Sequence, residues 1–396
     1  MRATRTGKAL LDVRTPRPTE PGTVSTAWPD VAEGEAEVRV DRSRFGLELN
    51  AAVAERLDEP TLARAHRRIQ RKAVAIGSWY IGSYALVLLA GSWWLGILAC
   101  TSLALSMAAV GFNIQHDANH NALFRTKGSK RLTACNRAVG WSMYALGGSA
   151  SQWIKGHVNT HHSATNIVGK DDDISLAPFA RLAPQQTRRP WHRCQHLYLW
   201  ALYCFTAVAI MVADIVATAT QSVVGDRRGK RPSIGEYTAL LTTKAAFVFA
   251  MVIIPALLHP WWIVVLGITL TLGIAGLLLG VVFQLAHAVE QAEFRTPDEP
   301  NDCTWHEWQV RSTVDFCHGR GPVARLVTWY TGGLNHQTEH HLFPRVPHTA
   351  YPEIADIVHA TCEKFEIPHH VQPTLRAAIG SHYRHLRRLS RPEPTR

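Results

Sequence analysis

Two long stretches without a charged side chain constrain this chain more than any other feature. Residues 73–115 and 245–289 contain no Asp, Glu, Lys or Arg. About 20 apolar residues suffice for a helix to cross the hydrocarbon core of a bilayer, so each stretch can cross twice. The alternative is a soluble fold with long buried helices, because a helix that is apolar on all sides is either buried or spans a membrane. Two such stretches in one chain favour the membrane.

Each apolar stretch carries turn and interface residues at its middle. Residues 91–94 read Gly-Ser-Trp-Trp, and residues 259–262 read His-Pro-Trp-Trp. Tryptophan is enriched at membrane–water interfaces, so these positions predict the outer turns of two helical hairpins. The expected spans are at about residues 74–93, 96–115, 240–258 and 262–286.

The placement of positive charge predicts the orientation. The net charge is +11, and basic residues gather at residues 64–72, 125–131 and 227–231, next to the apolar stretches. By the positive-inside rule these flanks are cytoplasmic. We therefore expect a multi-pass protein of the inner (plasma) membrane with both termini in the cytoplasm. No nucleic acid is expected as a partner, since no recognition motif accompanies the charge.

A third apolar segment, residues 196–221, contains Asp214. A single crossing here would put the basic flanks on its two sides on opposite faces of the membrane. We therefore expect the segment to lie in the interface or against the cytoplasmic part. The predicted fold is all-α and integral to the membrane, with four transmembrane helices in two hairpins and a cytoplasmic helical cap.

The ends of the chain differ from its middle. Residues 1–43 are rich in Pro, Thr, Glu and Arg without apolar periodicity, which predicts disorder. Residues 44–380 form the expected membrane domain, and residues 381–396 a loose basic tail. The seven cysteines are scattered and never spaced C-x-x-C, so neither disulfides nor a zinc ribbon is expected.

The arrangement of the histidines gives the strongest indication of chemistry in this sequence. The chain has 21 of them. Three tight groups occur: His116 with His120; His157 with His161 and His162; and His336 with His340 and His341. His287 ends the second apolar stretch on the side where His116 and His120 end the first. The other histidines show no shared spacing: His66, His192, His196, His259, His306, His318, His348, His359, His369, His370, His382 and His385.

The spacing within the groups predicts a metal centre. Residues four apart on a helix share one face, so His116 and His120 can reach the same ion. A directly neighbouring histidine points about 100° away and can serve a second ion. Imidazoles this dense without a metal would leave polar nitrogens unpaired. Imidazole suits iron, copper, zinc and nickel, so ligand type alone does not name the metal.

The motifs resemble those of the membrane fatty acid desaturases. The chain has His-x-x-x-His at 116–120, His-x-x-x-His-His at 157–162 and Gln-x-x-His-His at 337–341. Thr-His-His-Ser-Ala-Thr-Asn at 160–166, Asp-Asp-Asp-Ile at 171–174 and Gly-Gly-Leu-Asn-His-Gln-Thr-Glu-His-His-Leu-Phe-Pro at 332–344 are similar too. The resemblance covers roughly residues 68–367 and is closest to the bacterial branch related to front-end acyl desaturases.

The resemblance implies a chemistry and a ligand set. It implies oxygen-dependent desaturation of a fatty acyl chain, carried on coenzyme A, a carrier protein or a phospholipid, at a di-iron centre with O2 as co-substrate. The implied iron ligands are His116, His120, His157, His161, His162, His287, His340 and His341.

The third group departs from the family pattern at one position. Related sequences usually have an aromatic residue before the glutamine, where this chain has His336. Gln337 is the favoured family-equivalent residue, orienting a ligand or a water, and His336 remains a candidate ligand. Asp173, with Asp171 and Asp172, either orients histidines or belongs to a solvated loop.

Electrons must come from outside the chain. It has no His-Pro-Gly-Gly haem segment, dinucleotide fingerprint or iron–sulfur cysteine run. A separate ferredoxin-type or other donor is therefore expected. A basic cluster could dock an acidic carrier or contact anionic membrane lipid, and we favour lipid. The cluster comprises Arg125, Lys127, Lys130 and Arg131.

Two other functions compete with desaturation. A hydroxylase could use the same di-iron site, since alkane hydroxylases and carotenoid-modifying oxygenases share such histidine boxes. A membrane metal transporter would need ligands at mid-membrane, whereas these histidines gather at one boundary.

Overall fold

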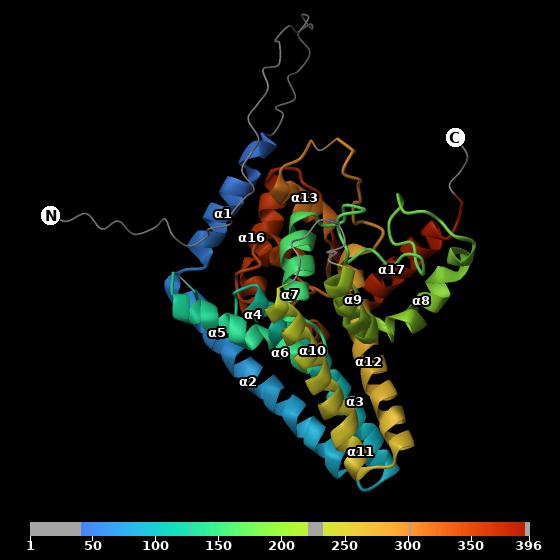
Figure 1. The fold of residues 1–396 in the computed structure, drawn as a ribbon. Helices are drawn as coiled ribbons and strands as arrows, with labels where there is room; N and C mark the ends of the chain where they lie inside the picture. The colour runs from blue at the N-terminus through green and yellow to red at the C-terminus, as the bar shows by residue number, and fades with distance from the viewer. Residues whose placement is uncertain (1–40, 127, 221–232, 301, 393–396) are drawn as a thin grey trace, which may run out of the picture.

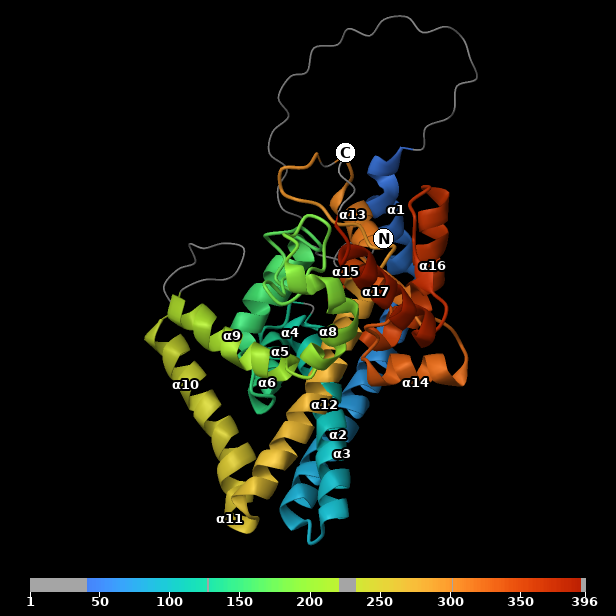
Figure 2. The same cartoon turned by 90° about the vertical axis from the view of Figure 1, so that its right-hand side faces the viewer.

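The computed structural model describes residues 41–126, 128–220, 233–300 and 302–392. Within these residues four helices are long and apolar enough to cross a membrane. They are Glu59–Leu89, Trp93–Asn119, Ile234–Leu258 and Trp261–His287. The turns of both hairpins lie at one end of the molecule, and the shorter helices form a cap at the other (Figures 1 and 2). The expected all-helical membrane fold is confirmed.

The first hairpin consists of α2 (Glu59–Leu89) and α3 (Trp93–Val110). Asp58 caps α2 by accepting a hydrogen bond from the Thr61 amide, and a proline follows in the first turn. The helix ends at Leu89, four residues before the expected end of this span at residue 93. At its cap end α3 passes through the π-turn η2 (Gly111–Gln115) into α4 (His116–Asn119).

The second hairpin pairs a broken helix with a continuous one. Its first arm is α10 (Ile234–Val248), the π-turn η6 (Phe249–Ile253) and α11 (Ile254–Leu258). Pro255 lies just after the π-turn, and proline has no N–H for a continuous α-helical ladder. The second arm is α12 (Trp261–His287), which packs against α3. Thus α3 and α12 form the inner pair of the four helices.

The outer surfaces of the hairpins are apolar. Trp261, Val265 and Leu266 at the start of α12 are all exposed, as are Trp93 and Leu98 of α3. Contiguous apolar surface of this kind is unfavourable in water and marks a contact with lipid. The protein is therefore an integral membrane protein with several spans.

The third apolar segment is sharply bent. The helices α8 (Gln195–Tyr203) and α9 (Thr206–Thr220) follow one another at an angle of 86°. Asp214 of α9 accepts hydrogen bonds from the Ser149 amide (2.7 Å) and the Lys244 ammonium (2.8 Å). The pairing explains how this apolar helix tolerates a carboxylate. The bend favours the expected interfacial placement, which remains a prediction.

The cap is made of short helices and one small parallel sheet. Its helices are α1 (Phe45–Arg56), α5 (Lys130–Gly140), α6 (Ser142–Ala145), α7 (Ala150–Trp153), α13 (Trp305–Ser312), α14 (Pro322–Tyr330), α15 (Gln337–Leu342), α16 (Tyr351–Lys364) and α17 (Leu375–Leu389). Strand β1 (Asp315–Phe316) pairs with β2 (Val371–Gln372). The buried side chains of α1, Phe45, Leu49 and Val53, pack on α16.

The ends of the chain require one correction. Most of the predicted disordered segment, residues 1–40, lies outside the described residues, but Asp41 already caps the 3-10 helix Arg42–Arg44. The prediction of a loose tail at residues 381–396 was wrong up to Leu389. Helix α17 buries His382 and Leu386 against α8 and α12, because its buried positions recur at helical spacing. The seven cysteines form no disulfide.

Candidate metal centre

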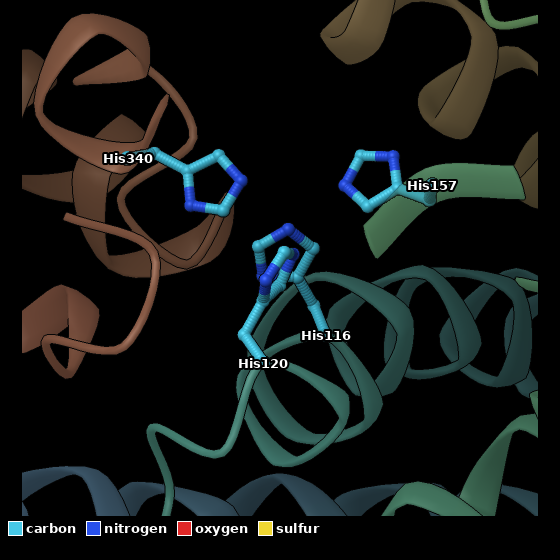
Figure 3. Close-up of side chains that lie close together, drawn as sticks. All are labelled: His116, His120, His157 and His340. Carbon is cyan, nitrogen blue, oxygen red and sulfur yellow. The ribbon is translucent and has the colours of Figure 1, made fainter. Parts of the chain in front are cut away.

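The first histidine pair lies where α3 enters the cap. The π-turn η2 precedes His116, and π-turns inside helices occur often at functional sites. His116 and His120 have ring centroids 4.7 Å apart, as the four-residue spacing predicts. Figure 3 shows both rings rising from one end of this helix toward His157 and His340.

The four-residue spacing of the second histidine group predicted a regular α-helix, but the group does not lie on one. His157 lies in the π-helix η3 (Ile154–Thr160), and His161 and His162 lie in the 3-10 helix η4 (His161–Ser163). The rings of His157 and His161 are stacked, with centroids 5.0 Å apart and planes at 19°. The planes of His161 and His162 differ by 84°, so the neighbouring rings diverge as expected.

The third group approaches the first through a glycine pair. Gly332 and Gly333 both have positive φ angles, of 65° and 71°. A Cβ atom on Gly332 would lie 2.3 Å from the carbonyl oxygen of Phe112, in the π-turn before His116. Only glycine permits both the backbone angle and this close approach. The turn leads into α15, which carries Gln337, His340 and His341.

The eight expected histidines form one cluster, here called the main cluster. The nitrogens of His116, His120, His157 and His340 lie within 4.8 Å of one another. The same limit joins His161, His287 and His341, and also His162, His340 and His341. All eight are buried. His287, which belongs to no motif, joins the cluster because α12 ends beside the second box.

Carboxylates orient the second group. His157 donates from Nδ1 to Asp173 (2.8 Å), and His161 donates from Nδ1 to Asp171 (2.9 Å). A carboxylate only accepts, so each Nδ1 carries a proton, and in the neutral ring the lone pair lies on Nε2. The Nε2 atoms of both rings are buried and have no hydrogen-bond partner in the described structure. Of the three neighbouring aspartates, Asp171 and Asp173 contact histidines and Asp172 does not.

Neutral groups support the third box. His341 donates from Nδ1 to the side-chain oxygen of Gln309 (2.8 Å), and His340 Nδ1 lies 3.2 Å from the Tyr351 hydroxyl. The Nε2 atoms of His116, His120 and His340 are again buried without a partner among the described residues. Nδ1 atoms held from outside and free Nε2 atoms inside are the arrangement of metal-binding histidines.

Burial and charge act differently on the histidine pKa values. Burial opposes the charge of His161, but the carboxylates of Asp171 and Asp173 outweigh it and raise its pKa to about 9. Burial, followed by repulsion from neighbouring rings, lowers the pKa of His162, His340 and His341 well below the ordinary value. At these three positions burial therefore favours the neutral ring that metal binding needs.

Gln337 and His336 face different clusters. The Gln337 side-chain nitrogen lies 2.8 Å from His287 Nε2 and 3.2 Å from His341 Nε2. His336 instead lies beside His318, with ring centroids 4.3 Å apart, and near the Glu339 carboxylate. We call His318, His336 and Glu339 the second cluster.

Several supporting residues were missed by sequence reasoning. Gln309 and Tyr351 contact third-box histidines from α13 and α16, and no motif or spacing marks them. Asp117, inside the first box, accepts hydrogen bonds from the amide and Nδ1 of His348. His348 lies four residues after the motif at 332–344, and this proximity could have marked it as part of the site.

Comparison with known proteins agrees with the motifs and the fold. The fatty acid desaturase family profile matches residues 91–373. The chain is 33% identical over 350 residues to the sn-1 linoleoyl-lipid 6-desaturase of Arthrospira platensis, covering 87% of this chain and 92% of the relative. It is 32% identical over 327 residues to the Synechocystis enzyme of the same name, covering 81% and 88%.

A third relative gives a similar match. The acyl-lipid (8-3)-desaturase of Physcomitrium patens is 32% identical over 338 residues, covering 83% of this chain and 68% of the relative. The buried histidine clusters are those of a metal site typical of such enzymes. The chain belongs to the fatty acid desaturase family and is an integral membrane oxidoreductase that desaturates fatty acyl chains.

Proposed function

We propose that the main cluster holds two iron ions through its eight histidines. The carrying observation is that Nε2 is buried without a partner among the described residues in His116, His120, His157, His161, His162 and His340. In His157 and His161 a carboxylate holds the Nδ1 atom behind it. His116, His120, His157 and His340 suit one ion, and His161, His287 and His341 suit the other. His162 lies against both His340 and His341 and completes the set.

Gln337 is proposed to act from outside the imidazole set. Its amide nitrogen contacts His287 Nε2 and His341 Nε2. With iron on these rings the amide would instead hold a water beside them. Asp171 and Asp173 keep His161 and His157 in the tautomer that presents Nε2 to the metal.

Bound iron supplies the oxygen chemistry that removes hydrogen from an unactivated methylene, which side chains alone cannot do. Two adjacent methylenes each lose one hydrogen and become an alkene, and O2 is reduced to two waters with two electrons from an external donor and two protons. The protein holds one carbon pair near the cluster and keeps water away. Trp153, stacked on His157 at 4.5 Å, and Phe283, at 5.9 Å from that ring, are the proposed apolar neighbours of the acyl chain.

The proposed substrate is an acyl chain esterified in a membrane lipid. The relatives from Arthrospira, Synechocystis and Physcomitrium are all named as lipid-linked desaturases. A lipid substrate also suits a site at the end of lipid-facing helices, since the chain can enter from the bilayer. Coenzyme A and carrier-protein thioesters are the alternatives that the test below separates.

The proposed orientation places the main cluster and both termini in the cytoplasm of a cell whose inner membrane holds the protein. It follows from the positive-inside rule applied to the basic flanks. A ferredoxin-type donor would meet the cap on that side. Of the expected basic cluster, Lys127 lies outside the described residues and Arg125 forms an ion pair with Glu59. Lys130 and Arg131 at the start of α5 are the proposed contacts with lipid phosphates or the donor.

Expression in a host of defined lipid content tests the proposal. Gas chromatography of the fatty acids should show a new double bond. In a second experiment the host is given a short pulse of labelled fatty acid, and the lipid classes are separated before hydrolysis. The labelled unsaturated chain should then appear first in intact membrane lipid. A label appearing first in a thioester pool would reject the lipid-linked substrate. A new hydroxyl group with no alkene would instead support the hydroxylase. His162→Ala serves as the inactive control.

A further inference from the structure

The second cluster is built like a metal site and lies outside the main cluster. His318, His336 and Glu339 each offer one ligand atom, and the three atoms lie within 4.8 Å of one another. His318 follows β1, His336 precedes α15, and Glu339 lies within α15. None of the three belongs to the ligand set that the family motifs imply.

Glu339 is the observation that points to a ligand. Its side chain is fully buried, and neither carboxylate oxygen accepts a hydrogen bond from a donor in the described structure. The Asp315 carboxylate lies beside it, and two neighbouring carboxylates without a cation must share a proton. The salt bridges of the described residues include none from Glu339 to a lysine or arginine. A buried, unpaired carboxylate is strongly unfavourable, so the group must either take up a proton or meet a cation.

The neighbouring imidazoles favour a metal cation. His336 Nδ1 and His318 Nε2 are both buried without a partner among the described residues. His336 Nδ1 lies 3.8 Å from a Glu339 oxygen. Nitrogen and oxygen ligands bind zinc at about 2.0–2.2 Å, which places two ligand atoms roughly 3.3 Å apart, so small side-chain movements suffice.

The surroundings hold the ligands in place, and the cluster lies close to the surface at His318. Asp315 beside the cluster is already engaged, accepting from the Thr338 amide (2.8 Å) and from His369 Nε2 (2.9 Å). It therefore fixes the start of α15. His318 is only partly buried, and exposed Gly319 and Arg320 follow it, so an ion can reach the site from the solvent.

We propose that His318, His336 and Glu339 bind a third metal ion, a divalent first-row transition ion such as Zn²⁺. Two imidazoles and one carboxylate with open positions suit such ions. The ion would join the segment after β1 to the first turn of α15, which also carries His340 and His341. The proposal does not depend on the chemistry of the main cluster.

Metal counting on the full-length, iron-loaded protein tests this proposal. The purified protein is equilibrated with Zn²⁺, desalted and analysed by mass spectrometry for iron and zinc. The total should fall from about three metal equivalents per chain to about two in His318→Gln, with iron unchanged. His359→Gln, an exposed histidine of the same region, should keep the wild-type total.

Co²⁺ in place of Zn²⁺ gives a second readout. Iron-loaded wild-type protein should develop visible cobalt absorption that His336→Phe and Glu339→Gln both lack, while all three keep the iron of the main cluster. Equal metal totals in the wild type and His318→Gln would overturn the proposal and leave Glu339 as a protonated acid beside Asp315. Loss of iron together with zinc in both His318→Gln and His336→Phe would also overturn it, because the second cluster would then not be independent.

Discussion

The two histidine clusters share the short helix α15 but differ in the support given to their rings. In the main cluster, Nδ1 atoms are held by Asp171, Asp173 or Gln309, and the Nε2 atoms of the carboxylate-held rings are free. In the second cluster, two imidazoles lie beside a buried carboxylate that accepts no hydrogen bond from a donor within the described residues. A histidine's position in a motif thus does not decide its role. The direction of its ring and the groups behind it decide that role.

The largest expected effect is the removal of one imidazole from the main cluster. In His162→Ala, desaturation should fall to background and bound iron should drop, because no other group can replace the lost nitrogen. We expect a loss of at least about 100-fold. His359→Ala, which removes an exposed histidine from the cap, should retain the wild-type product yield measured by gas chromatography. Full activity of His162→Ala would remove this residue from the ligand set.

The next effect concerns the carboxylates behind the second box. Asp171→Asn keeps the shape but no longer fixes the proton on His161 Nδ1, so iron affinity or activity should fall about 10- to 100-fold. Asp172→Asn is the matched control, since Asp172 contacts none of the histidines. Iron content after dialysis and product yield measure both variants. Equal losses in the two variants would mean that the loop's charge matters more than the contact.

A smaller effect is expected at the junction between the clusters. Gln337→Ala removes the amide between His287 and His341, and activity should fall by about tenfold with partial loss of iron. Gln337→His should restore iron binding, because the family motif accepts either residue here. Loss of main-cluster iron in His336→Phe but not in Gln337→Ala would contradict this assignment. It would mean that His336, and not Gln337, acts at the main cluster.

The smallest effect is a pH dependence of the iron-free protein. Burial lowers the pKa of His162, His340 and His341 in the folded chain, so below about pH 6.5 the unfolded chain binds more protons. Stability should therefore fall as pH falls through that value. The raised pKa of His161 has the opposite effect on stability, but only between about pH 6.5 and pH 9. Below that range His161 is protonated in both the folded and the unfolded chain, so it does not change the trend. Thermal unfolding of the metal-free protein should show a Tm that decreases from pH 7 to pH 5.5 by about 5 °C or more; a constant Tm would contradict it.

Much of the site was predictable because its residues are local in sequence. The spacing of the histidines identifies the groups at 116–120, 157–162 and 336–341. The ends of the apolar stretches predict that these groups lie at one membrane boundary. The π-helix around His157 was not predictable, since its residues carry no signal that separates it from an α-helix. The supporting Gln309 and Tyr351 were missed because they reach the third box only after the cap folds.

The sequence by itself determined the membrane class, the helical hairpins and the dense imidazole chemistry, because hydrophobic length and histidine spacing are local properties. The eight histidines of the main cluster were expected from the sequence, but only the tertiary structure showed which rings face one another and that His336 faces a different cluster. His287 joins the main cluster because α12 packs beside α3 and ends next to the second box. His336 turns away from Gln337 because adjacent residues at a helix start point in different directions, so one motif supplies two clusters.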